Sequence, residues 1–210
     1  MTLVITLLCF LCGSLMFSYW IGLLLKVNIR SVGDGNPGAA NLWSSAGAKF
    51  GIAGIALDFL KGYLPIVLVL HTGLLSGYQL IPAALAPIIG HAFSPFLKFN
   101  GGKSLAVSFG IWSGLTNFHA SLCFAIILAL LYIIMKVVKR GWKSSSNEDG
   151  LMTSLGFLLL FIYLFYDRYP VFILWIWLGN FLLLLWKNRH AITHVFKDKR
   201  KREEKISKIS

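Results

Sequence analysis

Charged residues are scarce in this sequence: Asp, Glu, Lys and Arg together make up 13% of its 210 residues, whereas hydrophobic residues make up 57%. The mean hydropathy is +0.72. A chain with so few polar residues cannot cover the surface of a water-soluble globular protein of this size. We therefore expect most of the chain to lie in lipid.

Cysteine is also scarce, and the three cysteines, Cys9, Cys12 and Cys123, all lie in apolar stretches. Their spacing indicates neither a disulfide framework nor a zinc site. We expect no metal and no cofactor. Basic residues are in excess, with a net charge of +12, but seven of them fall between Lys197 and Lys208. This tail is typical of an electrostatic tether to anionic lipids and does not indicate a nucleic-acid partner.

Four apolar stretches approach the roughly 20 residues that a membrane-spanning helix needs: Leu3 to Leu25, Phe50 to Leu70, Tyr78 to Leu97 and Pro170 to Trp186. A further stretch, Ser104 to Met135, is 32 residues long. Lys and Arg flank it on both sides, and cytoplasmic loops collect these residues. It should therefore cross twice, folding back near Gly114, Thr116 and Asn117.

The same reasoning makes Leu151 to Trp186 cross twice, with a break at Asp167, Arg168 and Pro170. The sequence thus predicts an all-α polytopic bundle of about seven membrane helices, with the N-terminus outside and the C-terminus cytoplasmic. In this orientation eighteen of the 20 Lys and Arg are cytoplasmic, Arg168 is outside and Lys61 lies within a helix. We expect one membrane domain over residues 1–189 and a basic cytoplasmic tail over residues 190–210.

The segment between the first two spans, Asn28 to Asn41, has more Gly and Asn than a connector needs. Its glycines match the GxGxxG spacing, but the strand that the dinucleotide fingerprint requires is missing. Glycines still allow successive N–H groups to face one anion, so a phosphate site is one interpretation and a tight solvated turn is the other. The candidate binding residues are Arg30, Gly33, Gly35, Asn36, Gly38 and Asn41.

A second glycine cluster, Gly101-Gly102-Lys103, precedes an apolar helix. It is not a Walker A loop, because Leu97 occupies the position of the required first glycine. Lys103 fits a phosphate contact at a helix N-terminus, or alternatively an anchor of the positive-inside type.

Three further polar residues lie within spans. Asp58 and Lys61 share a helix face at i and i+3, where they can bind substrate or neutralise each other. His91, near the end of the third span, fits either a catalytic or a hydrogen-bonded structural role. Because all of these elements approach one face of the membrane, we expect a shared pocket.

Together these residues resemble the PlsY family of bacterial membrane acyltransferases. The resemblance covers most of the chain and rests on several ordered motifs: Gly13-Ser14, Ile29-Arg30 leading to Gly-Asp-Gly-Asn-Pro-Gly-Ala-Ala-Asn41, Leu57-Asp-Phe-Leu-Lys61-Gly62, and Gly90-His91-Ala-Phe through Phe99-Asn-Gly-Gly-Lys103. It implies a seven-helix fold whose motifs face the cytoplasm, in the bacterial plasma membrane.

The resemblance also implies a reaction in which acyl-phosphate and glycerol 3-phosphate give lysophosphatidic acid and phosphate. Positioning and charge stabilisation would supply much of the rate, since acyl-phosphate is already activated. The donor's own phosphate would accept the hydroxyl proton. The candidate catalytic residues are Lys103, His91 and Asn36, and the expected partners are the two substrates and membrane lipids. The oligomeric state is left open.

The sequence departs from the pattern of the family that it resembles at five positions. It carries Asp34 in place of Ser, Ala40 in place of Thr, Ser44 in place of Arg, Ser104 in place of a small apolar residue or glycine, and Ala191 in place of Asn. Arg189, near the C-terminus, keeps the pattern and is a further substrate-binding candidate. An acidic residue at 34 would repel phosphate unless it points away. The alternatives are therefore a diverged paralogue with another acyl acceptor, or a membrane transporter or anion-binding module. Transporters usually show repeats and midplane charges, which this sequence lacks.

Overall fold

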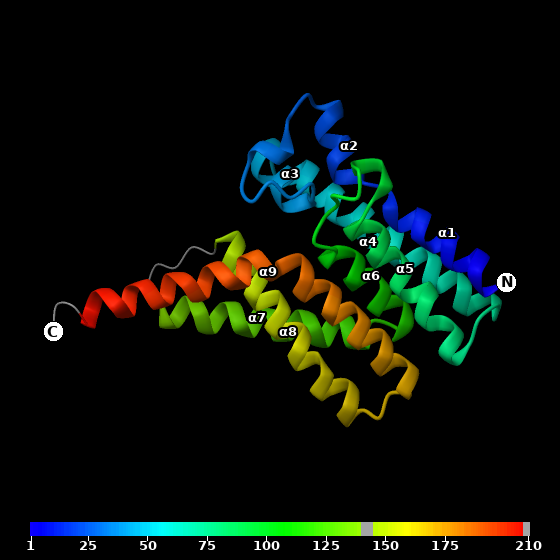
Figure 1. The fold of residues 1–210 in the computed structure, drawn as a ribbon. Coiled ribbons are helices and arrows are strands. Elements are labelled where there is room, and N and C mark those ends of the chain that lie inside the picture. The colour runs from blue at the N-terminus through cyan, green and yellow to red at the C-terminus, as the bar shows by residue number, and fades with distance from the viewer. Residues whose placement is uncertain (140–144, 208–210) are drawn as a thin grey trace.

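The computed structural model describes residues 1–139 and 145–207, and these residues form helices and connecting loops (Figure 1). Three short 3-10 turns lie between the α-helices, at Ile29–Ser31, Gly77–Gln79 and Pro95–Leu97. The α-helices follow in the order α1 Thr2–Ser14, α2 Phe17–Leu24, α3 Ala39–Ala46, α4 Ala48–Thr72, α5 Leu80–Ala92, α6 Leu105–Leu115, α7 His119–Val138, α8 Ser146–Tyr166 and α9 Val171–Ser207.

Six helical segments of the described chain are long and apolar enough to cross a membrane. They are Thr2–Leu24, Ala48–Thr72, Gly77–Leu97, His119–Val138, Ser146–Tyr166 and Val171–His194. A seventh apolar helix, Leu105–Leu115, is shorter. These segments confirm the predicted all-α membrane bundle. The side of the membrane on which each terminus lies stays a prediction.

Small residues allow the helices to approach closely in two pairs. A Cβ atom on Gly110 of α6 would lie 2.1 Å from the Phe59 carbonyl oxygen of α4. Between α1 and α5, a Cβ atom on Gly13 would lie 2.2 Å from the Pro87 carbonyl oxygen. Close packing of this kind is a main source of helix association in lipid, where no hydrophobic effect favours it. α5 contacts both α1 and α9, and it is the most buried of the six candidate spans.

The two predicted breaks in long apolar stretches are present. α6 ends at Leu115 and α7 begins at His119, and Asn117 and Phe118 in between have positive φ. Hydroxyl groups hold this turn: Thr116 Oγ1 donates to the Trp112 carbonyl and accepts from the Ala120 N–H. α8 and α9 are separated at Asp167 to Pro170 in the same way.

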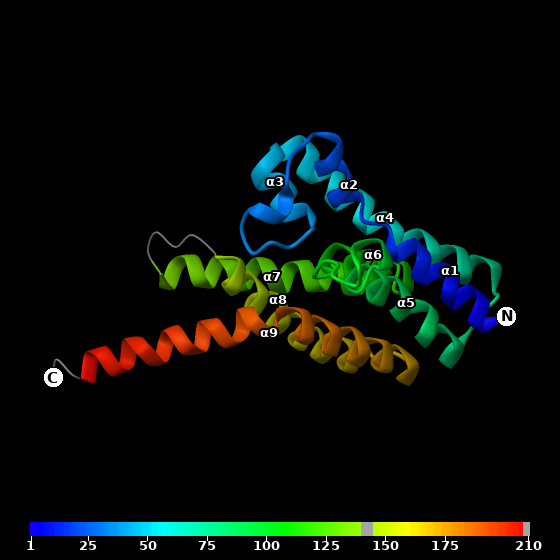
Figure 2. The ribbon, with the colours of Figure 1, turned by 45° about the horizontal axis from the view of Figure 1, so that its top comes forward.

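The helices leave one region where distant segments meet. The loop before α3 lies close to the beginning of α8, with the start of α6 nearby, in both views of the ribbon (Figures 1 and 2). α9 continues through residues 189 and 190, the boundary predicted from sequence between domain and tail. That division stays a prediction.

Candidate active site

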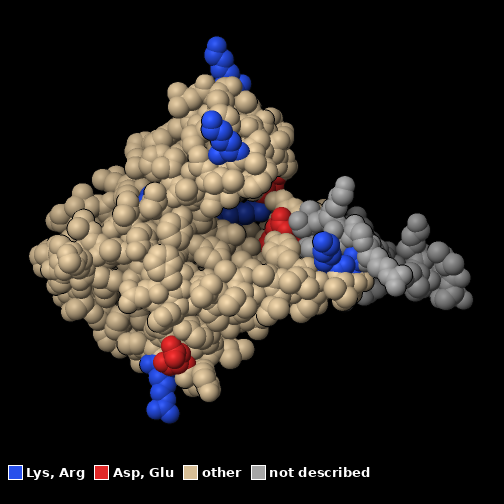
Figure 3. Space-filling model, turned by 180° about the vertical axis from the view of Figure 1, so that it is seen from behind, with Lys and Arg blue, Asp and Glu red and all other residues tan. Residues whose placement is uncertain are grey.

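A cavity of about 760 Å³ lies where the loop before α3, the start of α6 and the beginning of α8 converge. Figure 3 shows a hollow on this face of the molecule, with basic and acidic side chains inside it. Six of the candidate residues from the sequence line the cavity, together with Asp34: Asn36, Gly38, Asn41, Asp58, His91 and Lys103. Part of the predicted set therefore lines one cavity, and its role as a substrate site stays a prediction.

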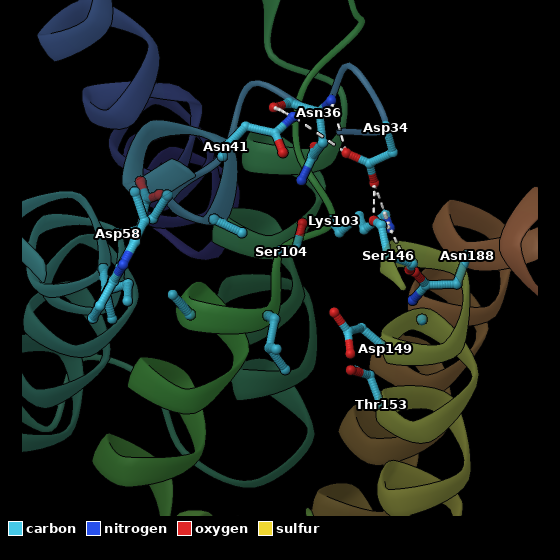
Figure 4. Close-up of a pocket in the computed structure, with 18 of the residues that line it drawn as sticks. Asp34, Asn36, Asn41, Asp58, Lys103, Ser104, Ser146, Asp149, Thr153 and Asn188 are labelled. Carbon is cyan, nitrogen blue, oxygen red and sulfur yellow. Dashed lines mark hydrogen bonds and ion pairs between the residues drawn. The ribbon is translucent and has the colours of Figure 1, made fainter. Parts of the chain in front are cut away.

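Lys103 is held at one wall of the cavity by two partners from different parts of the chain (Figure 4). Its Nζ lies 2.7 Å from Oδ2 of Asp34 and donates to the Ser146 hydroxyl oxygen at 3.3 Å. The Ser146 hydroxyl donates to the same Asp34 oxygen at 2.7 Å. Asp34 thus points toward Lys103 and does not point away from the site. Its charge would therefore repel a phosphate placed beside Lys103.

The Asp34 carboxylate is strongly stabilised in its charged form. Partial burial favours the neutral acid, but hydrogen bonds from Lys103 and Ser146 and the Lys103 charge outweigh this and lower the pKa of Asp34 to about 2. The other carboxylate oxygen accepts from the Asn36 N–H at 3.1 Å and from Asn41 Nδ2 at 3.3 Å. Asp34 therefore orders the glycine-rich loop and carries a full negative charge at neutral pH.

Gly101 and Gly102 place Lys103 by packing against the end of α5. Their N–H groups donate to the carbonyls of Ala92 and His91, at 3.2 and 3.0 Å. Lys187 of α9 secures the same loop, because its Nζ donates to the Ala92 and Gly101 carbonyls. These amides are engaged within the protein, and the two glycines do not line the cavity. In this arrangement they contribute by fixing the position of Lys103.

Asp58 and Lys61 form a buried ion pair with 2.8 Å between Oδ1 and Nζ. Ser18 donates to the other Asp58 oxygen at 3.1 Å, and Lys61 also donates to the Leu15 carbonyl. His91 is buried beside them, with Nδ1 3.9 Å from Asp58 Oδ1 and without a hydrogen bond. Asp58 and His91 reach the cavity wall, whereas Lys61 is directed to Asp58 and to α1.

Two arginine candidates lie outside the cavity lining. Arg30 donates through Nη2 to the Asn100 carbonyl at 2.7 Å, which ties the first glycine loop to the second. Arg189 is exposed, stacks on the Trp186 ring with its guanidinium carbon 4.4 Å from the ring centre, and donates to the Trp186 carbonyl. Gly33 and Gly35 have positive φ and shape the turn around Asn41 without lining the cavity.

Five polar residues that the sequence analysis did not single out also line the cavity: Tyr132, Ser146, Asp149, Thr153 and Asn188. Ser146, Asp149 and Thr153 lie in the first turns of α8, which begins with a capping box between Ser145 and Glu148. That capping box was a detectable helix start beside the apolar run. Nothing in the local sequence indicates which loop it faces.

Part of the cavity lining is apolar and suits a fatty chain. Trp43, Ile55, Leu105 and Phe109 form it, and Trp43 and Ile55 are also exposed on the surface that would face lipid. A site that combines a lysine with apolar side chains can hold an anionic head group with its chain in the bilayer. Among the described residues, no cluster of three or more His, Cys, Asp or Glu is arranged to hold a metal ion.

A bundle of apolar helices around a cavity that combines a lysine with apolar side chains is typical of an integral membrane protein with an amphiphilic ligand. The model of the glycerol-3-phosphate acyltransferase family matches residues 3–198. The chain therefore belongs to the glycerol-3-phosphate acyltransferase family, which confirms the resemblance found in its motifs.

Curated relatives and solved structures agree with this assignment. The chain is 35% identical over 193 residues to glycerol-3-phosphate acyltransferase 1 of Thermotoga maritima, covering 90% of this chain and 94% of the relative. The Aquifex aeolicus glycerol-3-phosphate acyltransferase is 28% identical, with 89% and 91% covered. The crystal structure of PlsY (YgiH) in its glycerol 3-phosphate form matches with a TM-score of 0.81 at 26% identity, over 94% of this chain and 92% of that one.

Proposed function

We propose that this protein transfers a fatty acyl group from acyl-phosphate to the sn-1 hydroxyl of glycerol 3-phosphate, releasing lysophosphatidic acid and inorganic phosphate. The observation that carries the proposal is the lining of the cavity, which combines the Lys103 ammonium with apolar side chains. Its relatives named glycerol-3-phosphate acyltransferase, and the PlsY structures with glycerol 3-phosphate and with lysophosphatidic acid, support this substrate class.

The transfer needs little from the protein beyond placement and charge. The glycerol hydroxyl oxygen attacks the carbonyl carbon of the acyl-phosphate, the bond from that carbon to the phosphate oxygen breaks, and the hydroxyl proton passes to the departing phosphate. Lys103 would stabilise phosphate charge, and the Ser146 hydroxyl would be a second donor. Asn36 and His91, which also line the cavity, would help to orient the acceptor.

The site would face the cytoplasm of a bacterial cell, with the protein in the plasma membrane. The distribution of Lys and Arg over the predicted loops supports this orientation. Membrane lipids would then lie against Trp43 and Ile55, which both line the cavity and are exposed, so a fatty chain would enter beside them.

The test is an acyl-transfer assay on purified protein in detergent with palmitoyl-phosphate and labelled glycerol 3-phosphate. Labelled lysophosphatidic acid should form, and palmitoyl-CoA should not replace the acyl-phosphate. Lys103→Ala should reduce the rate at least about 100-fold, as is common when a key electrostatic group is removed. Product formation by Lys103→Ala at the wild-type rate would disprove the role of Lys103, and absence of product from the wild type would disprove the function.

A further inference from the structure

The internal salt bridge at the cavity wall bears on how this protein binds its acceptor. Asp34 Oδ2 receives both the Lys103 ammonium, at 2.7 Å, and the Ser146 hydroxyl, at 2.7 Å. A lysine and a hydroxyl converging on one anionic oxygen are the donors that a phosphate oxygen would use. Asp34 therefore occupies the place where an anionic ligand would meet these two groups.

Few other positive charges are available to a phosphate in this cavity. Among the described residues that line the cavity, Lys103 is the only Lys or Arg. Three carboxylates, those of Asp34, Asp58 and Asp149, line it as well. The Asp58 charge is matched by Lys61. Ser44, on the helix that follows the glycine loop, supplies no charge and donates to the Ala40 carbonyl. Binding of a phosphate dianion thus depends on Lys103, whose charge Asp34 already neutralises.

Resting on the proposed function, we propose that Asp34 is a specificity-determining residue that acts as a built-in competitor for the acceptor's phosphate. The phosphate must displace the Asp34 carboxylate from Lys103 and Ser146, and the displaced carboxylate then stays close enough to repel it. The protein would consequently bind phosphate-bearing acceptors weakly. Removing the Asp34 charge should tighten this binding.

Asp34→Asn is the appropriate substitution because it removes the charge and keeps an oxygen for the bonds from the Asn36 N–H and the Asn41 amide. Asp34→Ser is a second variant with a smaller hydroxyl side chain. Asp167→Asn is the matched control, since it makes the same change in net charge at the exposed turn between α8 and α9.

The probe is inorganic phosphate, and its dissociation constant is measured by equilibrium binding to the full-length protein in detergent without acyl donor. Asp34→Asn should bind phosphate about tenfold more tightly than wild type, a difference that corresponds to about 1.4 kcal/mol. Asp167→Asn should stay within about twofold of wild type, because an exposed charge outside the cavity is screened. Adding Lys103→Ala to Asp34→Asn should abolish the gain.

Unchanged or weaker phosphate binding in Asp34→Asn and Asp34→Ser, or no detectable binding in any variant, would overturn the proposal, as would a gain that persists without Lys103. If one Asp34 variant fails to fold, as judged by its elution on size exclusion, the other decides. The acyl-transfer assay is independent of this measurement. If the wild type makes product and the Asp34 variants bind phosphate no more tightly than it does, only the role of Asp34 is disproved. If the Asp34 variants bind phosphate more tightly but the wild type makes no product, only the enzymatic function is disproved.

Discussion

A Cβ atom placed on Gly102 would lie 2.2 Å from Nε2 of His91, closer than two such atoms can approach. The His91 ring is buried, so it has little room to move away. Gly102→Ala should therefore shift the Lys103 loop, destabilise the fold by about 1 to 3 kcal/mol as overpacking usually does, and reduce acyl transfer at least about tenfold.

Thermal unfolding in detergent and the acyl-transfer assay measure the two effects of Gly102→Ala. His91→Ala introduced beside it would remove the clash, so the destabilisations in the double variant should fall short of additivity by more than about 0.5 kcal/mol. Additive losses would show that the contact between Gly102 and His91 does not set the loop position.

The ion pair between Asp58 and Lys61 is expected to be structural. Removal of one partner leaves a buried charge, so Asp58→Ala and Lys61→Ala should each cost about 3 to 5 kcal/mol of stability. Asp58→Asn combined with Lys61→Met removes both charges and should cost less than either single change. Denaturant unfolding in mixed micelles measures all three. Single variants with wild-type stability but a raised KM for glycerol 3-phosphate would instead assign the pair to substrate binding.

The contribution of Asp34 to the free energy of unfolding should depend on pH only at acidic pH, below about 4. Its pKa is lowered in the folded protein to about 2, from an ordinary value of 3.8. A lowered carboxyl pKa stabilises the fold above the unfolded value, and this contribution is lost as the pH falls from about 4 to about 2. The melting temperature of wild type relative to Asp34→Asn should be constant between pH 5 and 7 and decrease below pH 4. A decrease centred at pH 5 or above would contradict the ion pair with Lys103.

The predicted orientation can be tested with single cysteines in a protein whose three native cysteines are replaced. Val138, at the end of α7, is exposed and precedes a predicted cytoplasmic loop. Val138→Cys should therefore react with a membrane-impermeant maleimide only in inside-out vesicles. Arg168→Cys, at the turn between α8 and α9, should react only in intact spheroplasts. The reversed pattern would place the candidate site outside the cell.

Helix existence and helix breaks could be predicted from the sequence because they depend on local chemistry. Apolar length identified the long spans, and the polar residues around Thr116 and Asp167 marked the two turns. The length of α6 follows from the same signals. Its apolar stretch begins at Ser104 and the predicted turn lies near Gly114, Thr116 and Asn117, and the helix spans the 11 residues Leu105–Leu115.

The site was predicted only in part, because hydropathy does not tell which helix faces which loop. The glycine loop and Lys103 could be identified from composition, and their meeting was expected from topology. Ser146 and Asn188 could not, since they enter the cavity from α8 and α9, which are far away in sequence. The interaction of Asp34 with Lys103 depends on side-chain directions that a linear pattern does not contain.

The short helix α6 has a consequence for the surrounding lipid. Its 11 residues advance about 16 Å at 1.5 Å per residue, roughly half of a hydrocarbon core about 30 Å thick. With the Lys103 loop at the head groups, the turn after Leu115 would end deep within the membrane, although its residues 117–119 are exposed. Exposed non-helical backbone is not stable in hydrocarbon, so the bilayer would have to be thinner beside α6. A thicker bilayer would strain this region first, so bilayer thickness becomes a physical variable that acts on the helix carrying the lysine loop.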